Sequence, residues 1–416
     1  MPPETSTPGR LVHVVGAGPV GLMMAALLQT MGDYHIRLYE KRPSYTRTRM
    51  VRLDSYLVAD SIESYCIDYI DDENVKAVFD RTDLEAGVAS RESIAPDLRA
   101  LLLEWTLGFC PLNNIEEALS DLIERRGTNT VERVAGLLTP DDALAMVGPD
   151  DILIDCTGCK SLLRDRLTPE SGAEGRRADG TERADEDANL FTVRLEYALV
   201  ITFLYSRNYV CNEYCKYYKN AENTSYKFIP AVHRTYYDQE ISHVTGIVNI
   251  TEDEYRSMPP RFDSAWLRAN LPGVTASMDR FIERVTSETG GEIIGELEAI
   301  GIPLDLYHAR NVTGRRLREL SAADHPFSGA PVFLAGDSAI GSPYFQSISL
   351  GFECAMFLAG LIEQRLSPQE QFDRYENFMY KQWLRVYMRS KMIKHNKDLF
   401  ETLDDTYALL EKLHIY

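Results

Sequence analysis

Apolar and polar positions near the start of the chain form three successive segments. A short apolar run at Leu11–Val15 is typical of a buried strand, and an apolar run of helical length begins at Pro19. A further run at His35–Tyr39 predicts a second strand, which ends at the acidic Glu40. This order predicts a strand–helix–strand unit from a parallel sheet.

The pattern changes twice further along the chain. After a polar, charged segment at Thr168–Ala188, which we expect to be a surface loop, alternating β-branched and aromatic residues predict an antiparallel sheet from Asn189 to about Ile302. A helical pattern returns at the end. The other predicted elements are helices over Asn113–Arg126, Arg261–Asn270 and Met278–Thr286, strands over Asp151–Asp155 and Pro331–Ala335, a helix reaching Ile362, and a helical tail over Gln369–Tyr416.

The turn after the first strand has the glycine spacing of a dinucleotide-binding site. Gly16 permits a tight turn, Gly18 lets the backbone approach a pyrophosphate, and Gly21 lets the helix pack against the strand. The helix N-terminus would face the phosphate charge, and Glu40 is placed to accept hydrogen bonds from a ribose. Three neighbouring residues complete the predicted nucleotide-binding set: Pro19, Val20 and Lys41.

Charge and composition exclude several classes of partner. The 416 residues carry 44 basic and 63 acidic side chains, a net charge of −19, which argues against nucleic acid and anionic membranes as partners. No apolar run approaches the roughly 20 residues of a membrane span, and the proline-rich N-terminus does not have the pattern of a signal peptide. The seven cysteines are dispersed, so we expect reduced thiols and a cytoplasmic location.

Two later segments extend the dinucleotide hypothesis. Asp151–Arg164 and Pro331–Pro343 each begin with a short apolar strand that ends near a glycine. Together with the first turn, in this order, they resemble the group A flavin-dependent monooxygenases, the para-hydroxybenzoate hydroxylase-like superfamily. The resemblance implies an α/β fold. It would have a Rossmann-like, GR2-type FAD-binding domain over 1–165 and 303–365, an antiparallel substrate domain over 166–302, and a C-terminal helical segment over 366–416.

The resemblance also implies roles for individual residues. The strand ending at Gly336 would present Asp337 to the ribityl chain of FAD, and the loop to Pro343 would lie along the isoalloxazine. Arginines after the second strand contact the flavin side in this family, and this sequence offers Arg47 and Arg49 there. Asn113 stands where the family often has an arginine or glutamine. No metal ligands are implied, and a four-cysteine zinc site that uses Cys156 and Cys159 is disfavoured because that pair overlaps the second FAD segment.

The expected reaction is monooxygenation. NAD(P)H would reduce FAD, O2 would form a hydroperoxide at flavin C4a, and an apolar or aromatic small molecule would be hydroxylated or epoxidised. A tyrosine-rich stretch of the predicted sheet is compatible with an aromatic pocket and equally with an ordinary β core. The natural setting is secondary metabolism, including antibiotic biosynthesis.

Departures from the family keep a second hypothesis open. Thr157 replaces the usual aspartate of the middle segment, and Ser347 and Ser349 stand where glycines are usual. These favour FAD in a non-oxygenase role, such as a cyclase with structural FAD, a double-bond reductase or a halogenase. The Trp-x-Trp-x-Ile-Pro segment of halogenases is absent from the sequence, which makes a halogenase the less favoured of these alternatives.

Overall fold

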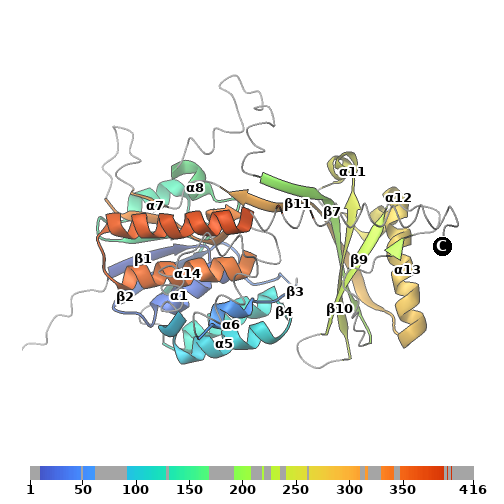
Figure 1. Cartoon of the computed structure of the whole chain (residues 1–416), viewed down its shortest axis with the longest axis horizontal. Coiled ribbons are helices and arrows are strands. Elements are labelled where there is room, and N and C mark those ends of the chain that lie inside the picture. Colours follow the sequence, from blue (N-terminus) through green and yellow to red (C-terminus); the bar gives the residue numbers. More distant parts are fainter. Residues whose placement is uncertain are drawn as a thin grey trace, which may run out of the picture.

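The protein, described here from a computed structural model, contains two β-sheets with flanking helices (Figure 1). One sheet is mostly parallel and the other is antiparallel, as the apolar pattern predicts. The predicted loop over Thr168–Ala188 lies outside the described residues. The structure describes residues 10–47, 50–60, 91–127, 131–167, 192–207, 218–219, 226–234, 240–259, 262–309, 314–316, 329–341, 347–387, 391 and 395.

The first sheet has the strand order β12–β13–β6–β1–β2–β5, in which all pairs are parallel except β12 with β13. The chain runs from β1 to β2 and β5 on one side, and then returns to β6 on the other side of β1, so the strand order reverses at β1. In open α/β sheets, ligands bind in the crevice at the carboxyl ends of the strands at such a point. The strands are β1 (Arg10–Val15), β2 (Tyr34–Glu40), β5 (Val131–Ala135), β6 (Ile152–Asp155), β12 (Gly314–Arg316) and β13 (Pro331–Leu334).

Helices cover both faces of the parallel sheet because successive side chains of a strand point to opposite sides. Val12 and Val14 pack into the larger core, formed with α1 (Pro19–Leu28), α6 (Leu112–Arg125) and α14 (Ser347–Glu363). Val15 faces the other way, into a smaller core with residues of α7 and α8. These two helices span Pro140–Met146 and Leu162–Leu167.

Helix α1 is apolar all round because it is enclosed. Every residue from Gly21 to Leu28 is buried, and the helix contacts both α6 and α14 as well as the sheet. Helix α14 is covered in turn by a helix over residues 368–387, where Phe378 stacks on Phe357 with ring centroids 3.9 Å apart. The predicted helical tail is therefore confirmed over this stretch.

A buried ionic cluster fastens this last helix to α14. Arg385 and Gln382 both reach the carboxylate of Glu353, each at 3.1 Å, and Glu353 is only 2% exposed. The guanidinium groups of Arg385 and Arg91 lie 5.7 and 5.8 Å from the ring centroid of Tyr56. The cluster thus joins four segments that are separate in sequence.

Short elements follow the second strand. The segment Tyr45–Leu53 contains strand β3 (Met50–Val51), and the turn after it is a 3-10 helix, η1 (Ser55–Val58). Strand β3 pairs with β4 (Cys110–Pro111), which is distant in sequence. Helix α5 (Pro96–Leu107) packs against η1 and α6.

The second sheet has the strand order β14–β11–β7–β10–β9–β8, and every pair in it is antiparallel. Helices α12 (Ser264–Asn270) and α13 (Pro272–Thr289) lie on the side of this sheet that faces away from the parallel sheet (Figure 1). The elements are β7 (Thr192–Tyr205), β8 (Tyr218–Lys219), β9 (Lys227–Arg234), β10 (Ser242–Ile250), β11 (Ile293–Ala309), β14 (Ile340–Gly341), α11 (Glu252–Ser257), α12 (Ser264–Asn270) and α13 (Pro272–Thr289).

The two faces of the antiparallel sheet differ. The face toward α13 holds the core, including Phe203, Tyr205 and Phe228. Leu204 and Ile229 belong to the opposite face and are 36% and 38% exposed. In the tyrosine-rich stretch of the sequence, Tyr205 is a core residue, while Tyr209, Tyr214 and Tyr217 lie outside the described residues.

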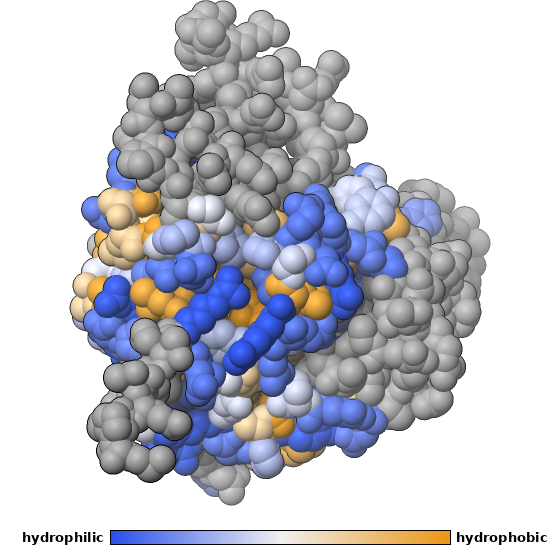
Figure 2. Space-filling view, turned by 90° about the vertical axis from the view of Figure 1, so that its left-hand side faces the viewer, coloured by the Kyte–Doolittle hydropathy of each residue, from blue (hydrophilic) through white to orange (hydrophobic). Residues whose placement is uncertain are grey.

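Strand β14 joins the two sheets. It follows η5 (Gly336–Ser338) after the parallel strand β13 and pairs with the end of β11, where His308 lies opposite Gly341. The third predicted cofactor segment is therefore attached to the antiparallel sheet. Figure 2 shows the far end of the parallel-sheet lobe, whose coloured surface is mostly hydrophilic with small hydrophobic groups between, as the high content of charged residues suggests.

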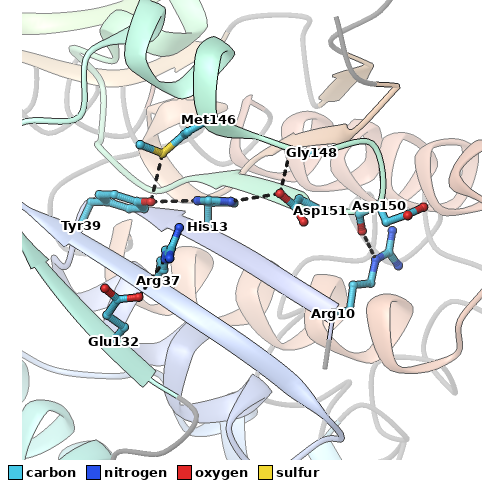
Figure 3. A network of polar contacts seen from close by, with 9 residues as sticks. All are labelled: Arg10, His13, Arg37, Tyr39, Glu132, Met146, Gly148, Asp150 and Asp151. Carbon is cyan, nitrogen blue, oxygen red and sulfur yellow. Dashed lines mark hydrogen bonds and ion pairs between the residues drawn. The ribbon is translucent and has the colours of Figure 1, made fainter. Parts of the chain in front are cut away.

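A buried polar network lies under α7 (Figure 3). The Nδ1 atom of His13 is 2.9 Å from the Tyr39 hydroxyl, and its Nε2 atom is 3.4 Å from a carboxylate oxygen of Asp151. Burial lowers the pKa of His13 against the opposing effect of Asp151. The network ties β1 and β2 to the turn that leads into β6.

Candidate functional site

The glycine-rich turn has the geometry that the sequence predicts. Gly16 adopts φ of +95°, a conformation that favours glycine, and a Cβ there would lie 2.9 Å from the carbonyl oxygen of Cys156. Gly18 is the N-cap of α1 and makes no side-chain cap. The first backbone N–H groups of α1 are therefore available to an anion, as at other helix N-termini that bind phosphate.

A cavity of about 350 Å³ lies at the carboxyl ends of the parallel strands, within the usual range for ligand sites of about 300–1,000 Å³. All three predicted segments contribute to its wall. Its lining includes Val15, Gly16, Gly18, Pro19 and Val20 from the first turn, Tyr39, Glu40, Lys41, Arg42 and Arg47 around the second strand, Gly136, Leu137 and Leu138 after β5, Cys156, Thr157, Gly158, Lys160, Leu162 and Leu163 from the second segment, Ala335 and Asp337 from the third, and Ser347 and Ile348 at the start of α14.

Charged side chains form one wall of this cavity. Glu40 accepts hydrogen bonds from the Arg42 backbone and from two nitrogens of its guanidinium, at 2.9–3.0 Å. Burial opposes ionisation of Glu40, but the hydrogen bonds and charge of Arg42 outweigh it, so the pKa of Glu40 lies below its ordinary value. Arg42 also reaches Glu116, at 3.5 Å, and Arg47 forms an ion pair with the same carboxylate.

The second segment is held from inside by Asp155. This fully buried carboxylate accepts hydrogen bonds from the Thr157 backbone at 2.9 Å, from the Thr157 hydroxyl at 2.6 Å, and from the Ser161 hydroxyl. Burial raises the pKa of Asp155 despite these bonds. Thr157 therefore stands where the family has an aspartate, and the carboxylate of this segment lies two residues earlier and points inward.

Hydrogen bonds couple the second segment to the third. Arg164 donates to the backbone carbonyl of Ser338 at 2.9 Å and to that of Cys159 at 2.8 Å. The Ser338 hydroxyl donates to the Asp155 carbonyl at 2.7 Å. Asp337, which lines the cavity, is thus placed by a loop that is fixed on both sides.

Two glycines, one in the third segment and one in α14, lie close to the first helix. A Cβ on Gly351 would lie 2.5 Å from Val20 Cγ2, and Gly336, at φ of +65°, approaches the same side chain. Ser349 accepts a hydrogen bond from the Asp54 backbone at 3.0 Å, while Ser347 lines the cavity. The close approach between α14 and α1 is therefore supplied by Gly351, although serines replace the expected glycines upstream.

The predicted site residues divide into three groups. Gly16, Gly18, Pro19, Val20, Glu40, Lys41, Arg47 and Asp337 line the cavity. Gly21 and Gly336 support its wall from behind, and the Asn113 backbone N–H donates to the Arg47 carbonyl at 2.8 Å, which places the arginine. Arg49 and Pro343 lie outside the described residues.

Sequence reasoning missed Arg42, Lys160 and Glu116. Arg42 directly follows Glu40 and Lys41 and could have been included for that reason. Glu116 gave no comparable signal, because its place in an amphipathic helix predicted an ordinary charged position.

Within the described residues, no group of three or more histidine, cysteine or acidic side chains is arranged to hold a metal ion. Cys156 is buried and Cys159 is exposed, and both are free thiols. Over the same residues, no helix combines the length and apolar character needed to cross a membrane.

Comparison with known proteins gives structural matches. No protein-family model matches the chain, and no curated protein matches its sequence. The tetracycline destructase Tet(51) is similar at a TM-score of 0.50 and 10% identity, over 97% of this chain and 95% of that chain. The aromatic hydroxylase CabE from angucycline biosynthesis scores 0.48 at 15% identity, over 96% and 73%. The Diels-Alderase PyrE3 of pyrroindomycin biosynthesis scores 0.49 at 14% identity, over 97% and 77%.

The chain therefore shares the overall fold of the tetracycline destructase Tet(51). The residues that line the cavity fit a dinucleotide. Gly16 and Gly18 carry no side chain at the turn before α1, and Glu40 and Asp337 place carboxylates on the cavity wall.

Proposed function

We propose that the protein is an FAD-dependent monooxygenase that uses NAD(P)H and O2 to hydroxylate or epoxidise an apolar or aromatic small molecule of secondary metabolism. The observation that supports this most directly is the single cavity that all three predicted segments line. The free thiols of the four described cysteines support a cytoplasmic setting.

Residues of the cavity would divide the cofactor between them. The N-terminus of α1 and Gly18 would hold the pyrophosphate, Glu40 the adenosine ribose, and Asp337 the ribityl chain. Bound FAD would supply electron transfer and the activation of O2. Ser347 and Ile348, at the start of α14, line the cavity where backbone N–H groups of a helix N-terminus favour negative charge.

The antiparallel sheet would bind the substrate on its open face. Ile300 is 59% exposed and belongs with Leu204 and Ile229 to the face away from α13. His243 belongs to this face by its pairing with Leu204, and its Nδ1 atom is buried without a hydrogen-bond partner in the part of the chain that the structure describes. Burial lowers the pKa of His243, so it would be a neutral hydrogen-bonding group. An apolar molecule with one polar substituent fits this face.

A specific observation favours a second candidate, in which FAD serves a reaction without O2. The hydroxyl of Thr157 is turned to Asp155, so the second segment presents no carboxylate to the cavity. A cyclase with structural FAD or a double-bond reductase would tolerate this change more readily than a standard hydroxylase.

Anaerobic and aerobic turnover separates the two proposals. FAD-loaded protein should oxidise NAD(P)H and consume O2 when an apolar aromatic substrate is added, with matched stoichiometry. Substrate conversion without O2 or NAD(P)H consumption would reject the monooxygenase and favour the cyclase. NAD(P)H consumption that proceeds in the absence of O2 and yields a reduced product would favour the reductase.

A further inference from the structure

The carboxylate of Glu116 is buried directly beside the glycine-rich turn. Its side chain is 0% exposed, in the first part of α6. One oxygen contacts the guanidinium groups of Arg47 and Arg42, the latter at 3.5 Å. The other oxygen, Oε2, has no hydrogen-bond partner among the described residues. A buried carboxylate in this state is held in place by its two arginines.

Gly18 shows which space this cluster occupies. The atoms nearest to a Cβ placed on Gly18 are Arg47 Nη2 at 3.5 Å, Arg42 Nη2 at 3.8 Å and Glu116 Oε1 at 4.0 Å. In dinucleotide sites the second glycine of the pattern leaves this space open so that the pyrophosphate can approach the backbone. In this chain an internal anion and its counter-ions stand there, in front of the positive end of α1.

We propose that Glu116 is an internal anion that competes with the cofactor pyrophosphate for Arg42 and Arg47, and thereby sets the affinity of the site. The inference rests on the proposed binding of FAD. Binding of the pyrophosphate would transfer the two guanidinium groups, in part or entirely, from a carboxylate to phosphate oxygens. The same exchange would loosen the contact between Arg42 and Glu40, and so leave the Glu40 carboxylate open to ribose hydroxyls.

The charges of these residues determine whether substitution of Glu116 raises or lowers the affinity for the pyrophosphate. Glu40, Arg42, Arg47 and Glu116 together carry no net charge, so the cluster gives little electrostatic attraction for a doubly charged pyrophosphate. Substitution of Glu116 by glutamine keeps the shape and one acceptor but leaves a net positive charge beside the phosphate position. Charge-assisted hydrogen bonds of arginine to phosphate are strong, so we expect a gain in affinity of about tenfold or more.

The test compares E116Q with E117Q as a matched control. Glu117 is the next residue of α6 and is exposed. Binding of FAD, ADP and adenosine to wild-type and variant proteins is measured by calorimetry. We expect E116Q to bind FAD and ADP about tenfold tighter or more, to bind adenosine as the wild type does, and E117Q to change none of the three affinities.

Four binding results would test the proposed role of Glu116. Equal or weaker binding of ADP by E116Q overturns the inference while FAD binding by the wild type still stands. An equal gain for adenosine also overturns it, because adenosine carries no phosphate. Failure of wild type and E116Q alike to bind FAD or ADP rejects the proposed cofactor and this inference together. If E116Q does not fold, E116D, whose carboxylate is withdrawn by one methylene, should show a smaller gain for ADP, and no gain would overturn the inference.

Discussion

A methyl group on Gly21 would lie 1.9 Å from the carbonyl oxygen of Gly16. The turn and the helix that follows it are therefore packed against each other through two glycines, with no room for a side chain between them. This contact fixes where α1 begins, and with it the direction in which its N-terminus faces the cavity.

Gly21→Ala should destabilise the protein and remove dinucleotide binding. The clash is with backbone, which cannot rotate away, so we expect a loss of about 3 kcal/mol in the free energy of unfolding. Gly108→Ala is the control, because a Cβ there meets no atom within 4 Å. Thermal unfolding of both variants checks this, and equal melting temperatures for the two would contradict the packing.

Asp337→Asn should weaken FAD binding without loss of fold. The carboxylate lines the cavity, and the loss of a charge-assisted hydrogen bond is expected to reduce affinity by about 10- to 100-fold. The exposed Asp253, on α11, provides the control variant Asp253→Asn. Fluorescence titration with FAD measures both, and an unchanged dissociation constant for Asp337→Asn would remove this residue from the site.

His13 should make stability depend on pH. Burial lowers the pKa of His13 in the folded protein below its ordinary value of 6.5. At a pH between the folded and the unfolded pKa, the unfolded chain binds a proton that the folded chain does not. Stability is then lost as pH falls below about 6.5. The neighbours Tyr39 and Asp151 remain in place in the variant His13→Gln, which should show a weaker loss.

Denaturant unfolding between pH 7.5 and 5.5 measures this difference. His35 is 42% exposed on the same sheet, and His35→Gln should retain the pH dependence of the wild type. A pH dependence for His13→Gln equal to that of the wild type would show that His13 does not cause the loss.

Arg385→Met should destabilise the C-terminal helix. Removal of one partner from a buried ion pair leaves the Glu353 carboxylate partly uncompensated, a loss of about 3–5 kcal/mol. Arg374 lies on the exposed side of the same helix, so Arg374→Met should change stability little. Limited proteolysis and thermal unfolding compare the two, and similar behaviour would contradict the anchoring role of Arg385.

Local patterns were sufficient to predict the strand–helix–strand start, the two sheets and eight of the residues that line the cavity. Each depends on residues that are close in sequence: Gly16 to Gly21 within one turn, or the apolar run that ends at Asp337. Alternating β-branched and aromatic residues likewise predicted the antiparallel sheet that contains β7 and β10.

Contacts between distant segments could not be predicted in the same way. Glu116 lies 74 residues from Arg42, and nothing in a helical repeat indicates that one acidic residue is buried against two arginines. The inward carboxylate of Asp155 and the substitution of Gly351 for the expected upstream glycines also depend on tertiary packing. Asp155 and Gly351 stand at other positions than the residues expected from the family pattern, but the carboxylate of the second segment and the close packing of α14 on α1 are still present.

Titration of the purified wild-type protein with FAD tests the central claim most directly. Equilibrium binding followed by flavin fluorescence should give one FAD per chain, with competition by ADP. No saturable binding of FAD by folded protein would contradict the assignment of this cavity as a cofactor site.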